Sequence, residues 1–150
     1  MNEGERIDII RKSTRDIVLH LGYLNNQFGH IGSVSQCYAI HQLNERDMTP
    51  RELSAELLLD KTTVSRLVKG LVNKGYVKTE IQQKDRRSHI LKLTVLGREK
   101  LFEINRIARG QVQNALRQVP EEKQALISNG LAVYSHALKE SSFMKAHDGS

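Results

Sequence analysis

The sequence predicts a mostly α-helical fold that contains one small β-hairpin. Two short helices joined by a tight turn are indicated between residues 48 and 71, and two short strands follow directly at 76–81 and 89–94. The stretches before and after this central unit carry apolar residues at helical spacing. A helix-turn-helix followed at once by a two-stranded ribbon is a winged helix, so we expect a winged helix-turn-helix lobe at 33–95, flanked by helices at both ends.

The composition is that of a single folded domain. The 150-residue chain is 39% hydrophobic and 5% aromatic, so Leu, Ile and Val are expected to fill its core. No apolar run approaches the length of a membrane span, and residues 1–10 hold charges and no hydrophobic signal region, so we expect a cytoplasmic protein without membrane association. A single cysteine excludes an internal disulfide and a zinc site of the finger type.

Two helices are predicted before the central unit. The first runs from Glu5 to about Phe28, and a segment with two glycines at 29–32 ends it. Its apolar stripe consists of Ile10, Ile17, Leu21, Leu24 and Phe28. The second helix is expected from an N-cap at Ser35 to about Asn44, with Val34 placed to pack on Ala39 as a hydrophobic staple. A polar connection at 44–48 follows.

The helix-turn-helix is predicted from its capping residues. Thr49 is a suitable N-cap, Pro50 suits the first helical position, and Glu52 at the third can accept from the N–H of Thr49, which completes a capping box. After a turn of a few residues, Asp60 can cap a second helix over 61–73.

The second helix of this unit has two different faces. Its apolar face consists of Val64, Leu67, Val68 and Leu71. Its outward face consists of Thr62, Ser65, Arg66 and Lys69. Hydroxyl groups, an Arg and a Lys suit a helix that lies in the major groove of DNA, where Arg pairs with guanine and Thr or Ser contacts bases or phosphates. A solvated polar face without a partner is the alternative.

The predicted hairpin begins after Gly75, which suits the left-handed position that follows a helix. Its first strand places Val77, Thr79 and Ile81 on one face, and its second strand returns over 89–94. The polar and basic segment between them forms the tip of a wing at 82–89.

Two further helices are predicted after the wing. Thr94 can cap a long helix that reaches about Gln118, and Pro120 at the first helical position starts another that reaches about Glu140. The last ten residues lack an apolar stripe and are expected to fray. The apolar stripes of the terminal helices are longer than one small lobe can bury, which predicts a dimer. The alternative is that these helices fold back on their own lobe.

Positive charge is concentrated in the central unit. The net charge of the chain is +6, and residues 51–92 hold ten Lys and Arg against five Asp and Glu, whereas residues 1–50 hold five against six. A local excess of this kind is the electrostatic footprint expected of a surface that binds phosphate.

Residues 35–101 resemble the MarR family of bacterial transcriptional regulators. The stretch LLLDKTTVSRLVKGLVNKGYV is similar to the family's recognition helix and the start of its wing, Asp85-Arg86-Arg87 to its wing signature, and residues 93–97 to the junction with its long dimer helix. The resemblance implies one MarR-type domain over 1–150, in which helices at 5–30 and 95–140 intertwine with those of a second copy.

The resemblance also implies a set of DNA contacts. The recognition helix would lie in the major groove, and Arg87 would enter the minor groove, oriented by Asp85, with Arg86 nearer the phosphates. An ordinary solvated hairpin tip with an incidental ion pair is the alternative for 85–87. The candidate DNA-binding residues are Thr62, Thr63, Ser65, Arg66, Lys69, Lys84, Asp85, Arg86 and Arg87.

The histidines and the cysteine form no catalytic constellation. Cys37 and His41 lie one helical turn apart, and some relatives of the family sense zinc or oxidants through such residues. The paired histidines that metal sensing uses on the long helix are missing here, because this stretch offers Asn105, Arg106 and Arg109. We therefore interpret Cys37 as a buried structural residue and His41 as partly exposed, and expect neither a metal nor a cofactor.

The sequence thus predicts a homodimeric regulator that binds a pseudo-palindromic double-stranded DNA operator, usually to repress, and that is not an enzyme. In the family a small-molecule effector binds between the dimer helices and the DNA lobe, for which Tyr38 and His41 are the nearest candidates. A winged-helix protein-interaction module is the main alternative, and an architectural DNA-binding protein without a ligand is a weaker one.

Overall fold

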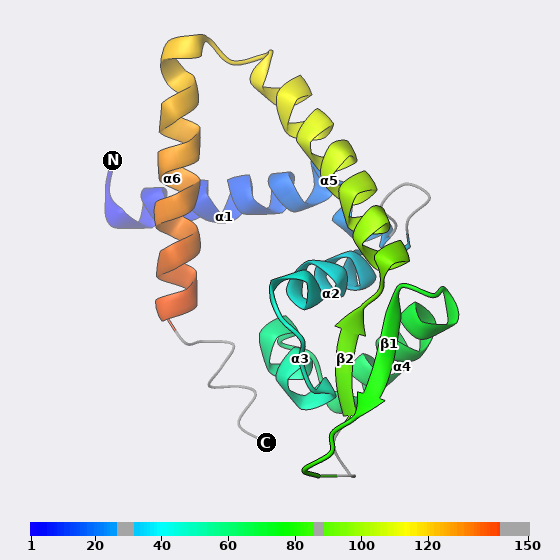
Figure 1. Cartoon of the computed structure of the whole chain (residues 1–150). Coiled ribbons are helices and arrows are strands. Elements are labelled where there is room, and N and C mark those ends of the chain that lie inside the picture. The colour runs from blue at the N-terminus through cyan, green and yellow to red at the C-terminus, as the bar shows by residue number, and fades with distance from the viewer. Residues whose placement is uncertain (27–31, 86–88, 142–150) are drawn as a thin grey trace.

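The computed structural model describes residues 1–26, 32–85 and 89–141. It contains six α-helices, one short 3₁₀ helix and one antiparallel hairpin (Figure 1). The α-helices and strands follow the predicted order, whereas the 3₁₀ helix was not predicted. The elements are α1 (Glu3–His20), η1 (Tyr23–Asn25), α2 (Val34–Glu45), α3 (Pro50–Leu57), α4 (Lys61–Asn73), β1 (Val77–Ile81), β2 (His89–Leu93), α5 (Val95–Leu116) and α6 (Glu121–Glu140). The predicted fold class, mostly α with a small β wing, is confirmed.

The elements are arranged as a compact lobe and a group of projecting helices. The lobe consists of α2, α3, α4 and the hairpin, and α5 leads away from it, while α1 and α6 lie on the side of the molecule away from the hairpin (Figure 1). Neither α1 nor α6 has a single buried residue. No described helix is both long enough and apolar enough to cross a lipid bilayer.

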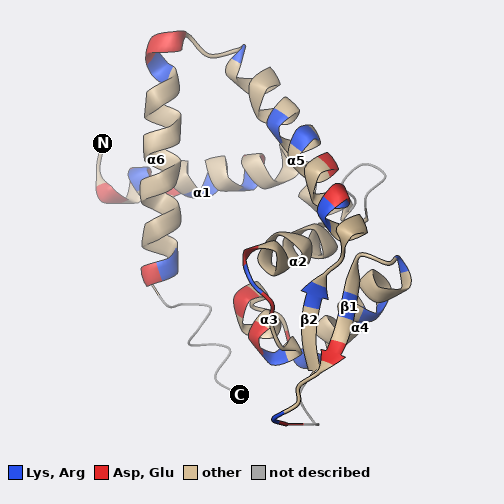
Figure 2. Cartoon of the chain, viewed as in Figure 1, with Lys and Arg blue, Asp and Glu red and all other residues tan. Residues whose placement is uncertain are grey.

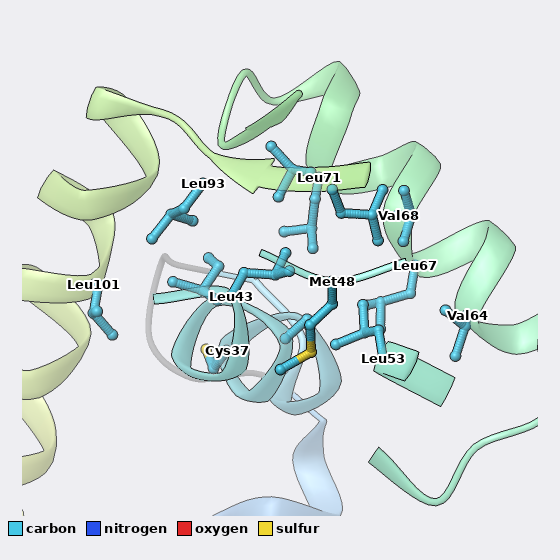
Figure 3. Packing of buried hydrophobic residues seen from close by; sticks show 14 of the residues in the cluster. Cys37, Leu43, Met48, Leu53, Val64, Leu67, Val68, Leu71, Leu93 and Leu101 are labelled. Carbon is cyan, nitrogen blue, oxygen red and sulfur yellow. The ribbon is translucent and has the colours of Figure 1, made fainter. Parts of the chain in front are cut away.

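The hydrophobic core lies inside the lobe. Side chains from α2, α3, α4 and β2 meet there, and Leu101 of α5 lies at one side (Figure 3). Ile104 of α5 belongs to the same core. The most deeply buried large side chains are Ile40, Met48, Leu53, Leu71 and Leu91. Burial of each such side chain contributes about 1.5–3 kcal/mol to folding, so the lobe has its own source of stability.

Both helices of the helix-turn-helix begin at the predicted caps. The Oγ1 of Thr49 accepts from the N–H of Glu52 at 3.1 Å, and the Glu52 carboxylate accepts from the N–H of Thr49 at 3.1 Å. Asp60 accepts from the N–H of Thr63 at 2.7 Å and begins α4. At the other end of α4, Gly75 has φ +82°, which is the left-handed conformation expected there.

The predictions for the first two helices were partly wrong. The cap of α2 is Ser33, whose Oγ accepts from the N–H of Gln36 at 3.1 Å, so neither the cap at Ser35 nor a staple from Val34 is formed. Helix α1 ends at His20, well before Phe28, because the chain turns at Gly22 with φ +85°. Phe28 itself lies outside the described residues.

Smaller differences occur elsewhere. Helix α5 ends at Leu116, and Pro120 is the residue before α6 rather than its first helical residue. The connection after α2 is not wholly polar, because Met48 is buried and exchanges two backbone hydrogen bonds with Leu91 of β2. On β1 only Val77 is buried and Ile81 is 61% exposed, since the far end of the hairpin extends beyond the core.

Candidate nucleic-acid interface

Helix α4 is fixed to the lobe by one face and free on the other. Its apolar face is buried in the core, and includes Val64, Leu67, Val68 and Leu71 (Figure 3). The predicted contact residues Thr62, Thr63, Ser65, Arg66 and Lys69 are all exposed. The helix contains three basic residues and no acidic one, so its outward surface presents positive charge and hydroxyl groups.

The start of α4 is organised by Asp60. Besides the backbone contact, one carboxylate oxygen accepts from the Thr63 hydroxyl at 2.9 Å. Hydrogen bonds from the backbone N–H and the hydroxyl of Thr63 hold the pKa of Asp60 below its usual value, so the carboxylate stays ionised. The Thr63 hydroxyl therefore takes part in the helix cap. The hydroxyls of Thr62 and Ser65, also in the first turns of α4, do not.

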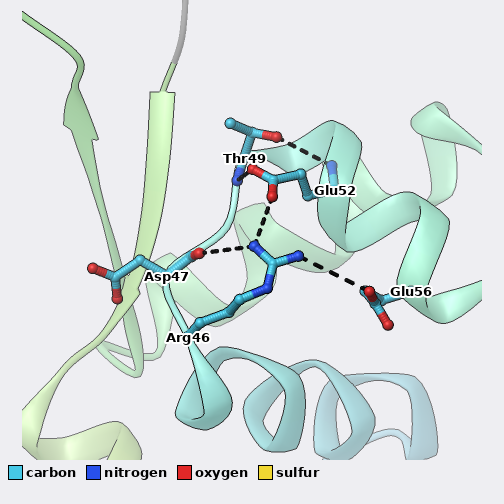
Figure 4. A network of polar contacts seen from close by, with 5 residues as sticks. All are labelled: Arg46, Asp47, Thr49, Glu52 and Glu56. Carbon is cyan, nitrogen blue, oxygen red and sulfur yellow. Dashed lines mark hydrogen bonds and ion pairs between the residues drawn. The ribbon is translucent and has the colours of Figure 1, made fainter.

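The first helix of the unit is held by Arg46, which the sequence analysis did not identify. Its guanidinium donates to Glu52 at 2.6 Å and to the carbonyl of Asp47 at 3.4 Å, and it lies 3.9 Å from Glu56 (Figure 4). These contacts join the end of α2 to α3, and the hydrogen bond from Arg46 is the main cause of a lowered pKa at Glu52. The sequence signal that could have indicated these contacts is the pair Glu52 and Glu56, spaced i, i+4 after Arg46.

The wing is a regular two-stranded ribbon next to α4. Val77 pairs with Leu93 and Ile81 with His89, and β1 contacts α4. Across the strands, Lys92 lies 3.0 Å from Glu80 and 3.7 Å from Asp47, so the ribbon is also connected to the start of the helix-turn-helix. Glu80 raises the pKa of Lys92 by its hydrogen bond and charge.

Only part of the predicted wing contact can be placed. Lys84 and Asp85 are exposed at the end of the ribbon. Arg86 and Arg87 lie outside the described residues. Figure 2 shows Lys and Arg along α4, both strands and the start of the tip, whereas acidic residues gather on α3. Basic residues therefore lie on both α4 and the ribbon, where Lys78 and Lys92 are paired with Glu80.

The lobe is joined to the long helix α5 through Thr94. Its hydroxyl donates to the carbonyl of Gly75 at 2.6 Å and accepts from the N–H of Gly97 at 3.0 Å. Gly97 lies so close to the backbone of Tyr76 that a Cβ there would be 2.3 Å from the Tyr76 carbonyl oxygen. The segment after α4 and the start of α5 are thus held in close contact.

A cavity of about 210 Å³ lies between α2, α5 and the end of α1. Tyr38 and His41 line it, together with Cys37 and Gln111 and a wall of apolar side chains. The rings of Tyr23 and Tyr38 meet edge to face, with centroids 6.3 Å apart. Burial raises the pKa of the Cys37 thiol and, with Tyr23, raises the pKa of Tyr38 to about 12.

The expected environments of Cys37 and His41 are confirmed, since Cys37 is buried and His41 is exposed. Among the residues that the structure describes, no three His, Cys, Asp or Glu side chains are close enough together to hold a metal ion.

Comparisons with known proteins agree with this geometry. The model of the MarR family matches residues 33–88. FabT of Streptococcus pneumoniae, solved in complex with DNA, is 26% identical, with a TM-score of 0.71 over 92% of this chain and 99% of that chain. A MarR transcriptional regulator from Methanosarcina mazei Go1 is also 26% identical, with a TM-score of 0.71 over 88% and 98% of the two chains.

The same fold occurs at lower identity. A mutant of MarR from E. coli is 18% identical, with a TM-score of 0.67 over 89% of this chain and 96% of that chain. No curated protein sequence matches this chain.

Proposed function

We propose that this chain, whose residues 33–88 match the model of the MarR family, is a transcriptional regulator that binds a specific double-stranded DNA sequence as a homodimer. The observation that carries the proposal is the exposed, basic and hydroxyl-bearing face of α4, held beside a two-stranded wing in a fold shared with a protein solved on DNA. We propose that it is not an enzyme and acts in the cytoplasm.

In this proposal the exposed residues of α4 contact different parts of the DNA, according to their position along the helix. Thr62, Ser65 and Arg66 would approach base edges in the major groove, and Lys69, further along, would contact phosphate. The wing residues Lys84, Asp85, Arg86 and Arg87 would contact the adjacent minor groove and backbone, as the family resemblance implies. Phosphate contacts of this kind release counterions, so affinity should fall steeply with salt.

The homodimer is supported by apolar surface that one chain leaves uncovered. On α1, Ile9 and Leu19 are 54% and 52% exposed, and on α6 Leu126 and Val133 are 77% and 71% exposed. A second copy related by a two-fold axis would cover both helices. The two recognition helices would then meet two half-sites, which makes a pseudo-palindromic operator the expected target.

We further propose that the protein represses and that a small effector relieves repression. The cavity lined by Tyr38 and His41 supports this, because it lies between the DNA lobe and α5 rather than on the DNA surface.

The test is a retardation assay on DNA selected from a random pool, run at two salt concentrations with scrambled competitor. The proposal predicts a retarded complex with the selected sequence. It also predicts that the logarithm of the affinity falls linearly with the logarithm of the salt concentration. A protein-interaction module would give no enriched sequence, and an architectural protein would bind selected and scrambled DNA alike. Either outcome would overturn the proposal.

A further inference from the structure

The side chain of Gln36 connects α2 to the end of α4. Its amide oxygen accepts a hydrogen bond of 2.8 Å from the Nζ of Lys74, which is the C-cap residue of α4. Its amide nitrogen lies beside Gly70, where an added Cβ would stand only 2.8 Å from that nitrogen. The two helices are also in direct contact. A single half-buried side chain of α2 therefore contacts α4 at two successive turns.

Two glycines make room for the Gln36 side chain. At Gly32, just before α2, an added Cβ would lie 3.0 Å from the Nζ of Lys74 and closer still to the amide oxygen of Gln36. Gly70 lies within α4, where Gly is less favourable than Ala. A larger residue at either position would displace the amide or the ammonium group. The close packing of Gln36 on α4 thus depends on glycines from two separate segments.

The contact lies on the side of α4 that also carries Arg66. Arg66, Gly70 and Lys74 are spaced i, i+4 and i+8, so they follow one another along the helix. The buried apolar face holds α4 on the lobe, but the hydrophobic effect has no preferred direction. A hydrogen bond is directional, so the contact from Gln36 restricts rotation and sliding of α4 on the lobe.

We propose that Gln36 is a positioning residue for DNA recognition. By holding Gly70 and Lys74, it fixes the orientation of α4 and, with it, the position of Arg66 against the base edges. Gln36 acts through α4 and does not itself contact DNA. This inference rests on the proposed function, because it assigns to Gln36 a share of the sequence preference.

Loss of the contact should reduce discrimination between DNA sequences rather than stability. The pairing of Arg66 with a base edge depends on geometry, whereas a flexible Lys tolerates a small shift of the helix against phosphate. Because one hydrogen bond is lost, we expect the ratio of affinities for selected and scrambled DNA to fall by roughly two- to tenfold.

Gly70→Ala tests the proposal without the removal of any polar or charged group. The atom that the added methyl group meets is the end of the flexible Gln36 side chain, which can move aside. Ala is also the better helix former, so the midpoint of thermal unfolding should stay unchanged or rise. Fluorescence anisotropy of the full-length protein with labelled DNA measures the affinity ratio, which should fall.

Gly110→Ala is the matched control. A Cβ at this position of α5 meets nothing within 4 Å, so the substitution brings the same gain in helix propensity away from α4. It should leave the midpoint unchanged or higher and keep the wild-type affinity ratio.

Two variants of Gln36 separate the hydrogen bond from the bulk of the side chain. Gln36→Met keeps the length and removes the acceptor, whereas Gln36→Glu keeps an acceptor oxygen for Lys74. We expect Gln36→Met to lower the affinity ratio as Gly70→Ala does, and Gln36→Glu to keep it within about twofold of the wild type. The effects of Gly70→Ala and Gln36→Met should not add in the double variant, because both break the same contact.

An unchanged affinity ratio in Gly70→Ala or Gln36→Met would overturn the positioning role. So would an equal loss in Gln36→Glu, additive effects in the double variant, a lower ratio in Gly110→Ala, or a fall in the ratio that comes with a lower unfolding midpoint. Failure of the proposed function looks different, since the wild type itself would then show no preference for selected over scrambled DNA. In that case both proposals fall together, whereas a wild-type preference that the variants keep removes the positioning role alone.

Discussion

Arg66 and Lys69 lie three residues apart on the exposed face of α4, and we expect them to have different roles. Arg66→Ala should weaken binding to the preferred site by about 1–3 kcal/mol and to scrambled DNA much less, because Arg contacts with base edges carry sequence information. Lys69→Ala should weaken binding to both DNAs to a similar degree, since a phosphate contact is independent of sequence. Retardation assays with both DNAs measure the two ratios. Equal losses on both DNAs for Arg66→Ala would mean that this residue does not contact bases.

Glu52 ties the stability of the helix-turn-helix to pH. Hydrogen bonds from Arg46 and Thr49 hold its pKa below the usual value of 4.5, so its contribution to stability is present above that value and is lost as pH falls through the lower folded value. Glu52→Gln should therefore reduce the loss of thermal stability between neutral and acidic pH. Glu99→Gln, at an exposed glutamate on α5, is the control. The same acid sensitivity in wild type and Glu52→Gln would contradict the assignment.

At the scale of elements, the junction between the lobe and α5 depends on Gly97. A Cβ at this position would lie 2.3 Å from the Tyr76 carbonyl oxygen and 2.6 Å from a methyl carbon of Leu93. Gly97→Ala should lower the free energy of unfolding by about 1–3 kcal/mol, the range for overpacked sites. Gly110→Ala on the same helix meets nothing within 4 Å and should stabilise by about 0.5–1 kcal/mol. Denaturant unfolding of both variants measures the difference, and two equal effects would contradict a tight junction.

The elements that the sequence predicted correctly are those with local signals. The caps at Thr49, Asp60 and Thr94 act within three residues of chain, so the side chain and its partner N–H are visible together in the sequence. Ser33 and Ser35 show the limit of such signals, because both are suitable caps by residue type and the structure uses Ser33.

Features made by distant segments could not be predicted. The bridge between Met48 and Leu91 joins a loop to a strand that follows the whole helix-turn-helix. The cavity needs α1, α2 and α5 to meet, so no local signal indicates it, and Tyr38 and His41 were expected there only from the family resemblance. In the candidate site, the exposed face of α4 could be predicted from the helical spacing of its apolar residues. The contacts of Arg46 were missed because Glu52 and Glu56 lie on the next helix. The DNA-binding roles, including those of Arg86 and Arg87, stay predictions.

At the scale of the whole molecule, α1 and α6 have no buried residue, which predicts a dimer built on these helices. Leu131→Asp should shift the protein toward a monomer, because it places a charge on the apolar surface of α6. Asn129→Asp adds the same charge to an exposed polar position two residues earlier and should leave the dimer intact. Sedimentation at micromolar concentration measures both. A wild type that sediments only as a 17.1 kDa species would contradict the dimer.

Loss of the dimer should also reduce operator affinity, since one chain can contact only one half-site. Leu131→Asp is therefore expected to keep weak binding to a single half-site while it loses the tight complex with the full operator. The control Asn129→Asp should bind the full operator as the wild type does.

The most direct test of a symmetric dimer that recognises a DNA sequence is the spacing between its half-sites. Two recognition helices related by a two-fold axis contact half-sites about 10 base pairs apart, on one side of the duplex. Insertion of about 5 base pairs between the half-sites of the selected operator rotates one of them to the opposite side. We expect this half-turn insertion to abolish tight binding, and a full-turn insertion of about 10 base pairs to recover most of it if the dimer can span the added length. Unchanged affinity for the half-turn operator would contradict a symmetric dimer that contacts both half-sites at once. Together with equal losses on preferred and scrambled DNA for Arg66→Ala, it would leave a basic protein that binds DNA without regard to its sequence.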